Sequence, residues 1–218
     1  KHELDITLSH LFSERKKIEV SHIKSKMLEN NIAYIQVTDF DGGAADEFKK
    51  NYQELKSQGA TSLIVDIRDN GGGVVDEAID MLEMICDQGS TLLIETDKNG
   101  NEKIEKSKEK PIIDIPIVVL VNGNSASASE IFAGALKDYN KAKIIGTKTY
   151  GKGVIQTLTM LSDGSGLKMT TAEYCTPSRN KINKIGIEPN ITVELPEDIE
   201  ELTEANDTQL QRAIDELK

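Results

Sequence analysis

The fold is decided by the stretch Ile115-Pro116-Ile117-Val118-Val119-Leu120-Val121, which runs directly into Asn122-Gly123-Asn124-Ser125-Ala126-Ser127-Ala128-Ser129-Glu130. The first half is rich in β-branched residues and predicts a buried strand. After the second half, Ile131, Ala135 and Leu136 recur at helical spacing and predict a helix. A strand that breaks sharply into a helix at small hydroxyl residues can present a nucleophile, because the helix start supplies unpaired N–H groups and a positive dipole end.

The same serines have a purely structural interpretation. Ser127 and Glu130 have the spacing of a capping box, in which the two side chains hydrogen-bond the first backbone N–H groups of the helix and do no chemistry. On this stretch alone, capping is the stronger interpretation and catalysis is the alternative.

Size and composition limit the classes of protein to which this chain can belong. The 218 residues are enough for one α/β domain, alone or with a small appendage. The net charge of −11 argues against a nucleic acid or an anionic membrane as the main partner. Two cysteines are too few for a disulfide framework or a zinc site, and no apolar run of about 18 residues predicts a membrane span. Because the chain starts at Lys1 without a methionine, we expect it to be a trimmed fragment.

The positions of the histidines bear on the choice of a catalytic base. All three, His2, His10 and His22, lie near the start of the chain, and none is near the serine cluster in sequence. A Ser-His-Asp triad would require one of them to fold back onto Ser127, and no motif supports that. If the serine is a nucleophile, a lysine is therefore the better candidate base.

Strands and helices alternate along the middle of the chain. We expect strands at 31–40, 62–67, 91–96, 115–121, 142–146, 154–161, 167–174 and 191–193, and helices at 44–58, 74–87, from about 128 to 140, and at 207–218. The alternation predicts an α/β layer with mainly parallel strands, and residues 154–174 predict a hairpin. No element is predicted for 21–31, and the charged segment 102–110 is expected to be solvated.

Two further features can carry chemistry, and each also has an ordinary structural interpretation without a catalytic role. The triplet Gly71-Gly72-Gly73 follows a predicted strand and can present bare N–H groups to a ligand, although a simple tight turn is at least as good an interpretation. Lys152 lies between two glycines; on sequence alone it is most simply a surface lysine, but burial would favour the neutral amine that a general base needs.

Three motifs, in their order along the chain, resemble those of the C-terminal processing peptidases, which are also called tail-specific proteases. They are Ile67-Arg68-Asp69-Asn70-Gly71-Gly72-Gly73, the stretch from Val121 to Glu130, and Tyr150-Gly151-Lys152-Gly153-Val154-Ile155-Gln156. Later stretches agree as well: Asp163-Gly164-Ser165, Thr170-Thr171-Ala172-Glu173-Tyr174, Thr176-Pro177-Ser178, Gly186-Ile187-Glu188-Pro189 and Asp207-Thr208-Gln209-Leu210. The resemblance covers residues 20 to 217.

The resemblance implies a serine endopeptidase with a Ser–Lys pair on a crotonase/ClpP-like core with small β extensions. Carried over residue by residue, the nucleophile is Ser127, the base is Lys152, and Gln156 orients the lysine. The oxyanion donors would be the backbone N–H groups of Ala128 and of a glycine in the triplet, Gly72. No metal or cofactor is implied. The implied substrates are unstructured or C-terminal regions of polypeptides, the implied location is outside the bacterial cytoplasm, and a homodimer is compatible with the family.

The chain also departs from the family pattern. Most members carry a PDZ domain before the core, whereas residues 1–20 have room only for its last strand and a linker, so we expect the peptidase domain at 21–218. Gly71 replaces the usual proline of its motif, and Asn190 replaces the usual acidic residue after Pro189. The alternatives are a non-catalytic ligand-binding relative, a resting form of the peptidase, and an acyl-CoA enzyme of the same broad fold.

Overall fold

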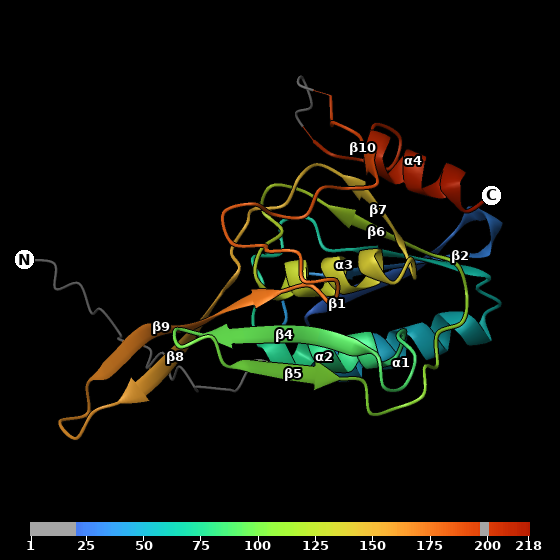
Figure 1. The fold of residues 1–218 in the computed structure, drawn as a ribbon. Helices are drawn as coiled ribbons and strands as arrows, with labels where there is room; N and C mark the ends of the chain where they lie inside the picture. Colours follow the sequence, from blue (N-terminus) through green and yellow to red (C-terminus); the bar gives the residue numbers. More distant parts are fainter. Residues whose placement is uncertain (1–20, 197–200) are drawn as a thin grey trace, which may run out of the picture.

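The computed structural model describes residues 21–196 and 201–218 (Figure 1). The last PDZ strand and the linker that are expected in residues 1–20 lie outside this range. Among the described residues, no helix has the length and apolar character needed to cross a membrane.

A six-stranded sheet forms the centre of the fold, in the order β1-β2-β3-β6-β7-β10. Its strands are β1 (Ile23–Leu28), β2 (Ile32–Val37), β3 (Ser62–Asp66), β6 (Ile117–Val121), β7 (Lys143–Gly146) and β10 (Ile191–Thr192). The last five run parallel, and β1 pairs antiparallel with β2. Strands β3 and β6 are buried at every position, as expected when both faces of a parallel sheet are covered. The predicted α/β fold with a parallel-rich sheet is confirmed.

Helices cover both faces of this sheet. They are α1 (Ala44–Ser57), α2 (Val75–Glu83), α3 (Ala128–Asp138) and α4 (Thr208–Glu216), with a short 3-10 turn, η1 (Glu29–Asn31), between the first two strands. Figure 1 shows α1, α2 and α3 on one side and α4 on the other. Two separate apolar clusters match this arrangement: Phe48, Met81 and Phe132 belong to the larger, whereas Leu210 and Ala213 of α4 belong to the smaller.

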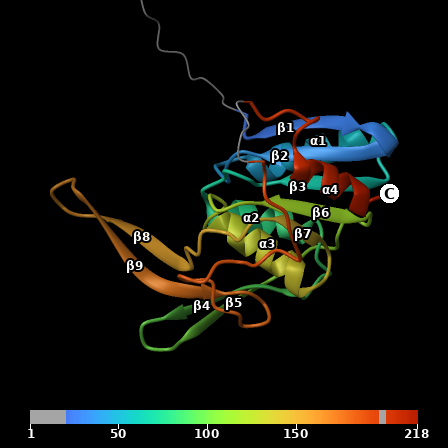
Figure 2. The ribbon, with the colours of Figure 1, turned by 90° about the horizontal axis from the view of Figure 1, so that it is seen from above.

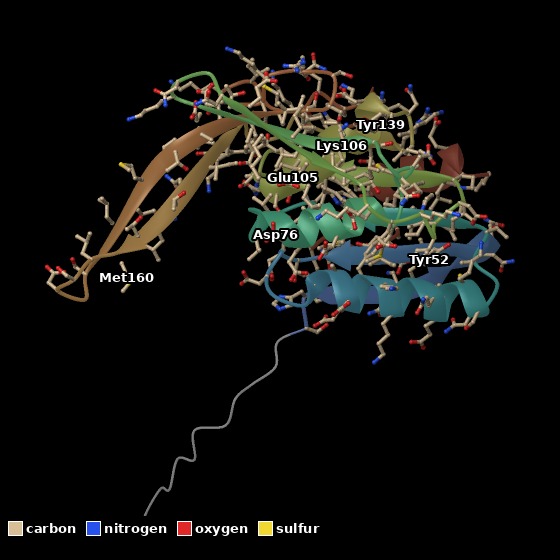
Figure 3. All side chains as sticks on the ribbon, turned by 60° about the horizontal axis from the view of Figure 1, so that its bottom comes forward. Tyr52, Asp76, Glu105, Lys106, Tyr139 and Met160 are labelled. Carbon is tan, nitrogen blue, oxygen red and sulfur yellow. The ribbon has the colours of Figure 1, made fainter. Side chains whose placement is uncertain are left out.

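A second, four-stranded sheet has the order β5-β4-β9-β8. Its strands are β4 (Thr91–Asp97), β5 (Glu102–Lys106), β8 (Val154–Met160) and β9 (Gly166–Cys175). The predicted hairpin at 154–174 is the pair β8–β9, which projects away from the body (Figures 1 and 2). Met160, near its far end, points into solvent (Figure 3) and is 66% exposed.

Two segments differ from the prediction. Residues 21–31 contain β1, which was missed because only Ile23 of its six side chains is buried and so the apolar alternation is absent. Part of the charged segment 102–110 is β5, whose side chains are mostly exposed as predicted, although the backbone pairs with β4. Both are edge strands, where charged side chains are common.

A buried ion network attaches α4 to the sheet. The Arg68 guanidinium, just after β3, donates to both carboxylate oxygens of Asp66 and to both of Asp207, at 2.6 to 3.1 Å. Asp207 in turn caps α4 by accepting from Leu210 N–H at 2.9 Å. Tyr34 completes the network by donating to Asp66 Oδ2 at 2.7 Å. The helix is therefore held by charges as well as by apolar packing.

We expect Arg68→Gln to lower the free energy of unfolding by about 3–5 kcal/mol, because it leaves two buried carboxylates without their cation. Urea unfolding followed by circular dichroism measures this. The matched control is Arg179→Gln, which removes an exposed ion pair with Glu102 and should change stability little. Equal losses in the two variants would contradict the assigned role of the network.

Candidate active site

Ser127 lies at a strained turn between β6 and α3. Its backbone angles are φ 56° and ψ −114°, a conformation that a residue with a Cβ rarely adopts. Such strain costs about 1–3 kcal/mol and persists only where the surroundings enforce it. Gly72 makes room for the turn, since a Cβ there would lie 2.8 Å from the Ser127 Cβ. The turn sets the serine at the carboxyl edge of the parallel sheet, where ligand sites form.

The two flanking serines hold this turn against the loop that follows β3. The Ser125 hydroxyl donates to the Ile67 carbonyl oxygen at 2.8 Å, and the Ser129 hydroxyl donates to the Asn70 carbonyl oxygen at 2.8 Å. Ala126 N–H donates to the same Asn70 oxygen at 3.0 Å. Both serines are fully buried, and their hydroxyls are used in structural bonds.

The Glu130 carboxylate joins this turn to the loop that carries Lys152. Its Oε2 accepts from Ser127 N–H at 3.0 Å and from Lys152 N–H at 2.8 Å. Its Oε1 accepts from the Thr149 hydroxyl at 2.6 Å and from Gly151 N–H at 2.7 Å. Glu130 therefore makes its half of the predicted capping box, and with its other bonds it also fixes the backbone of Lys152 relative to that of Ser127.

The Tyr174 hydroxyl makes a second connection between the same two residues. It lies within hydrogen-bond distance of the carbonyl oxygens of both Ser127 and Lys152, and can donate its one proton to either. Burial raises the pKa of this phenol well above its usual value, and the nearby Glu130 carboxylate raises it further. The hydroxyl therefore stays protonated and remains a donor.

Ser127, Lys152 and Gln156 line one cavity of about 160 Å³. The other lining residues are Gly73, Val75, Val154, Ile155, Lys168 and Tyr174. Gln156 reaches the cavity from β8, four residues after the lysine. His22 does not line it and instead places its Nδ1 2.6 Å from Asp39 Oδ1. The residues that the sequence predicted as nucleophile, base and orienting amide thus meet at one place.

Within the glycine triplet, the backbone polar groups of Gly72 and Gly73 have different surroundings. Gly72 N–H donates to the Asn70 side-chain oxygen at 2.8 Å, and Gly72 does not line the cavity. Phe40 bonds to the carbonyl of Gly72 and to the N–H of Val74, so the polar groups of the intervening Gly73 point away from Phe40. Gly73 lines the cavity with Ser127, and a Cβ on it would lie 2.5 Å from the Phe40 oxygen.

Ala128 is the first residue of α3 and is fully buried. An N–H group in the first helical turn has no partner within its own helix, so the Ala128 N–H can donate elsewhere. In the part of the chain that the structure describes, no group of three or more His, Cys, Asp or Glu side chains could hold a metal ion.

Comparison with known proteins shows the family of this chain. Residues 31–193 match the model of peptidase family S41. The chain belongs to peptidase family S41. It is 39% identical over 186 residues to the carboxyl-terminal-processing protease of Synechocystis, covering 85% of this chain and 43% of that protein. It is 38% identical over 185 residues to a probable CtpA-like serine protease of Staphylococcus aureus, covering 84% of this chain and 37% of the relative.

The fold of this S41 chain is similar to that of the photosystem II D1 C-terminal processing protease, with a TM-score of 0.74 and 33% identity over 91% of this chain and 53% of the other. The match places the chain in a peptidase family, as the motifs predicted. The chain spans less than half the length of the curated relatives quoted above.

Sequence reasoning missed two residues that build this S41 site. Glu130 was recognised only as half of a cap, and Tyr174 only as part of a family motif. The spacing Ser-x-x-Glu was a signal for the first, but its bonds to Gly151 and Lys152 cross more than 20 residues of sequence and follow no local pattern.

We expect Glu130→Gln to lower the free energy of unfolding by about 2–5 kcal/mol, because an amide has one acceptor oxygen and turns its NH2 group toward buried donors. Thermal and urea unfolding measure the loss. Glu188→Gln is the matched control, since that carboxylate is exposed and pairs with the surface lysine Lys148. A Glu130→Gln variant as stable as the wild type would show that this carboxylate does not hold the two loops together.

Proposed function

We propose that this domain is an endopeptidase that cleaves polypeptides with Ser127 as nucleophile and Lys152 as general base. The observation that supports it best is that both side chains line one small cavity while Glu130 and Tyr174 hold their backbones together. A nucleophile and a base that are fixed relative to each other need little reorganisation to react.

The proposed reaction has two steps. As Ser127 Oγ attacks the carbonyl carbon, the Lys152 amine takes the hydroxyl proton and the carbonyl electron pair moves to oxygen. The proton then passes to the leaving amine as the C–N bond breaks, which leaves an acyl ester on Ser127. Water then attacks the ester carbon while Lys152 takes a proton from it, and as the C–O bond to Ser127 breaks Lys152 returns that proton to Ser127 Oγ, which releases the new C-terminal acid. Gln156 would orient the lysine amine from β8.

We propose that the oxyanion is bound by the backbone N–H groups of Ala128 and Gly73. The expected donor in the triplet was Gly72, but its N–H is already bonded to Asn70. The Gly73 alternative is supported by its place in the cavity lining and by the direction of its polar groups away from Phe40. The positive end of the α3 dipole would add to the stabilisation.

The proposed substrate is an extended, unstructured polypeptide, and we include C-terminal tails in this class. Strand β8, which carries Gln156, is an edge strand of the second sheet, so one side of its backbone can pair with another extended chain. We further propose, from the family resemblance, that the protein acts outside the cytoplasm, that residues 1–20 end a PDZ module, and that residues 21–218 are the peptidase domain. A homodimer remains part of the same proposal.

We expect Ser127→Ala and Lys152→Ala each to reduce cleavage of casein by at least about a thousandfold, because neither proton transfer nor acyl transfer proceeds without its group. Gel-based cleavage measures activity, and circular dichroism checks that the variants are folded. Lys148→Ala is the matched control: it removes an exposed lysine four residues earlier that pairs with Glu188, and should retain activity. Full activity in either of the first two variants would exclude this mechanism, and an inactive wild type would favour the non-catalytic alternative.

A further inference from the structure

The charged side chains that line the cavity are opposite in sign to the net charge of the chain, although the buried Glu130 carboxylate lies behind Ser127 and Lys152. The chain carries −11 overall, yet the cavity lining contains two lysines, Lys152 and Lys168, and no Asp or Glu. Asp76 follows a lining residue but is exposed and does not line the cavity itself. The proposed mechanism uses Lys152 and leaves Lys168 without a role.

Lys168 is placed on the same face of the hairpin as Gln156. In the β8–β9 register, Gln156 lies opposite Thr170 and Leu158 lies opposite Lys168. Because side chains alternate between the two faces of a strand, Gln156, Leu158 and Lys168 share one face. Lys168 therefore reaches the cavity from β9, while Gln156 reaches it from β8.

No carboxylate of the described residues neutralises Lys168. The salt bridges found within 21–196 and 201–218 use other cations, and the nearest acid on β9, Glu173, accepts from the Asn183 amide at 3.1 Å. An ammonium group at the edge of a cavity, without an internal partner, is suited to bind an anion that enters with the ligand.

We propose that Lys168 determines specificity by binding a carboxylate of the substrate within a few residues of the bond that is cleaved. The carboxylate can be an Asp or Glu side chain or the free C-terminus of the polypeptide. The proposal rests on the peptidase function proposed above. Since Lys168 does not act on the reacting atoms, it would bind ground state and transition state alike and would affect KM more than kcat.

The test starts from a neutral, unstructured peptide whose cleaved bond is located by mass spectrometry. Glu, Gln and Lys are then placed in turn at each of the three positions on either side of that bond. A second set of peptides ends within the same distance and carries either a free carboxylate or an amide at its C-terminus. The Glu–Gln comparison reports on side chains, and the acid–amide comparison reports on the C-terminus.

For the wild type we expect a KM about three- to tenfold lower for the acidic peptide than for its neutral partner, at one position or at the free terminus, and a smaller difference at high salt. Lys168→Gln should abolish the difference with little change in kcat. Lys168→Glu should reverse it in favour of the Lys peptide. Lys98→Gln removes the same charge from a turn outside the cavity and should keep the wild-type preference.

A wild type with no preference in either set, or a preference that survives Lys168→Gln, would overturn the proposal. Failure of the proposed function is recognised separately. If no peptide is cleaved, the same peptides are titrated against Ser127→Ala, with and without Lys168→Gln, by fluorescence anisotropy. Tighter binding of the acidic peptides that depends on Lys168 would support the carboxylate site without catalysis, and its absence would overturn it.

Discussion

One buried carboxylate holds the candidate site together. Glu130 accepts four hydrogen bonds: one from the Ser127 N–H, one from the Lys152 N–H, and two from Thr149 and Gly151 in the loop that leads to that lysine. A fully buried carboxylate is costly unless it is satisfied, so the loops must come together for the fold to keep it. Because the buried carboxylate must keep all its hydrogen bonds, the backbones of the proposed nucleophile and base are held in a well-defined relative position.

The strain at Ser127 is balanced by bonds on both sides of it. Ser125 and Ser129 attach the turn to the loop after β3, and the fully buried Asn70 attaches that loop to β2 by donating to the Val37 carbonyl oxygen at 2.9 Å. Three parallel strands thus end in loops that are bonded to one another. These bonds explain how Ser127, a residue with a Cβ, can keep a positive φ. The close packing of the turn explains why only a glycine fits at position 72.

The second sheet supplies the other wall of the cavity. Hairpin β8–β9 brings Gln156 and Lys168 to Ser127, while its far end stands in solvent (Figure 2). In a chain of net charge −11, two lysines and no Asp or Glu line this cavity, and these lysines would draw anionic groups toward this edge of the molecule. Fold and electrostatics therefore point to the same side of the domain as the place where the proposed polypeptide substrate would bind.

Hydrophobic period and residue order were enough to predict the parallel sheet and its helices, because burial determines those patterns. The hairpin, whose strands are mostly exposed, was predicted from the order of its segments instead. The motifs also named Ser127, Lys152 and Gln156, which the fold brings to one cavity. The sequence could not show β1, whose exposed side chains hide the strand period, nor the role of Glu130. It also could not show that the Gly72 N–H is bonded to the Asn70 side chain while the polar groups of Gly73 point away from Phe40. The direction at Gly73 depends on the bonds from Phe40 to the residues on either side of it, and only the tertiary structure decides the direction of a backbone group.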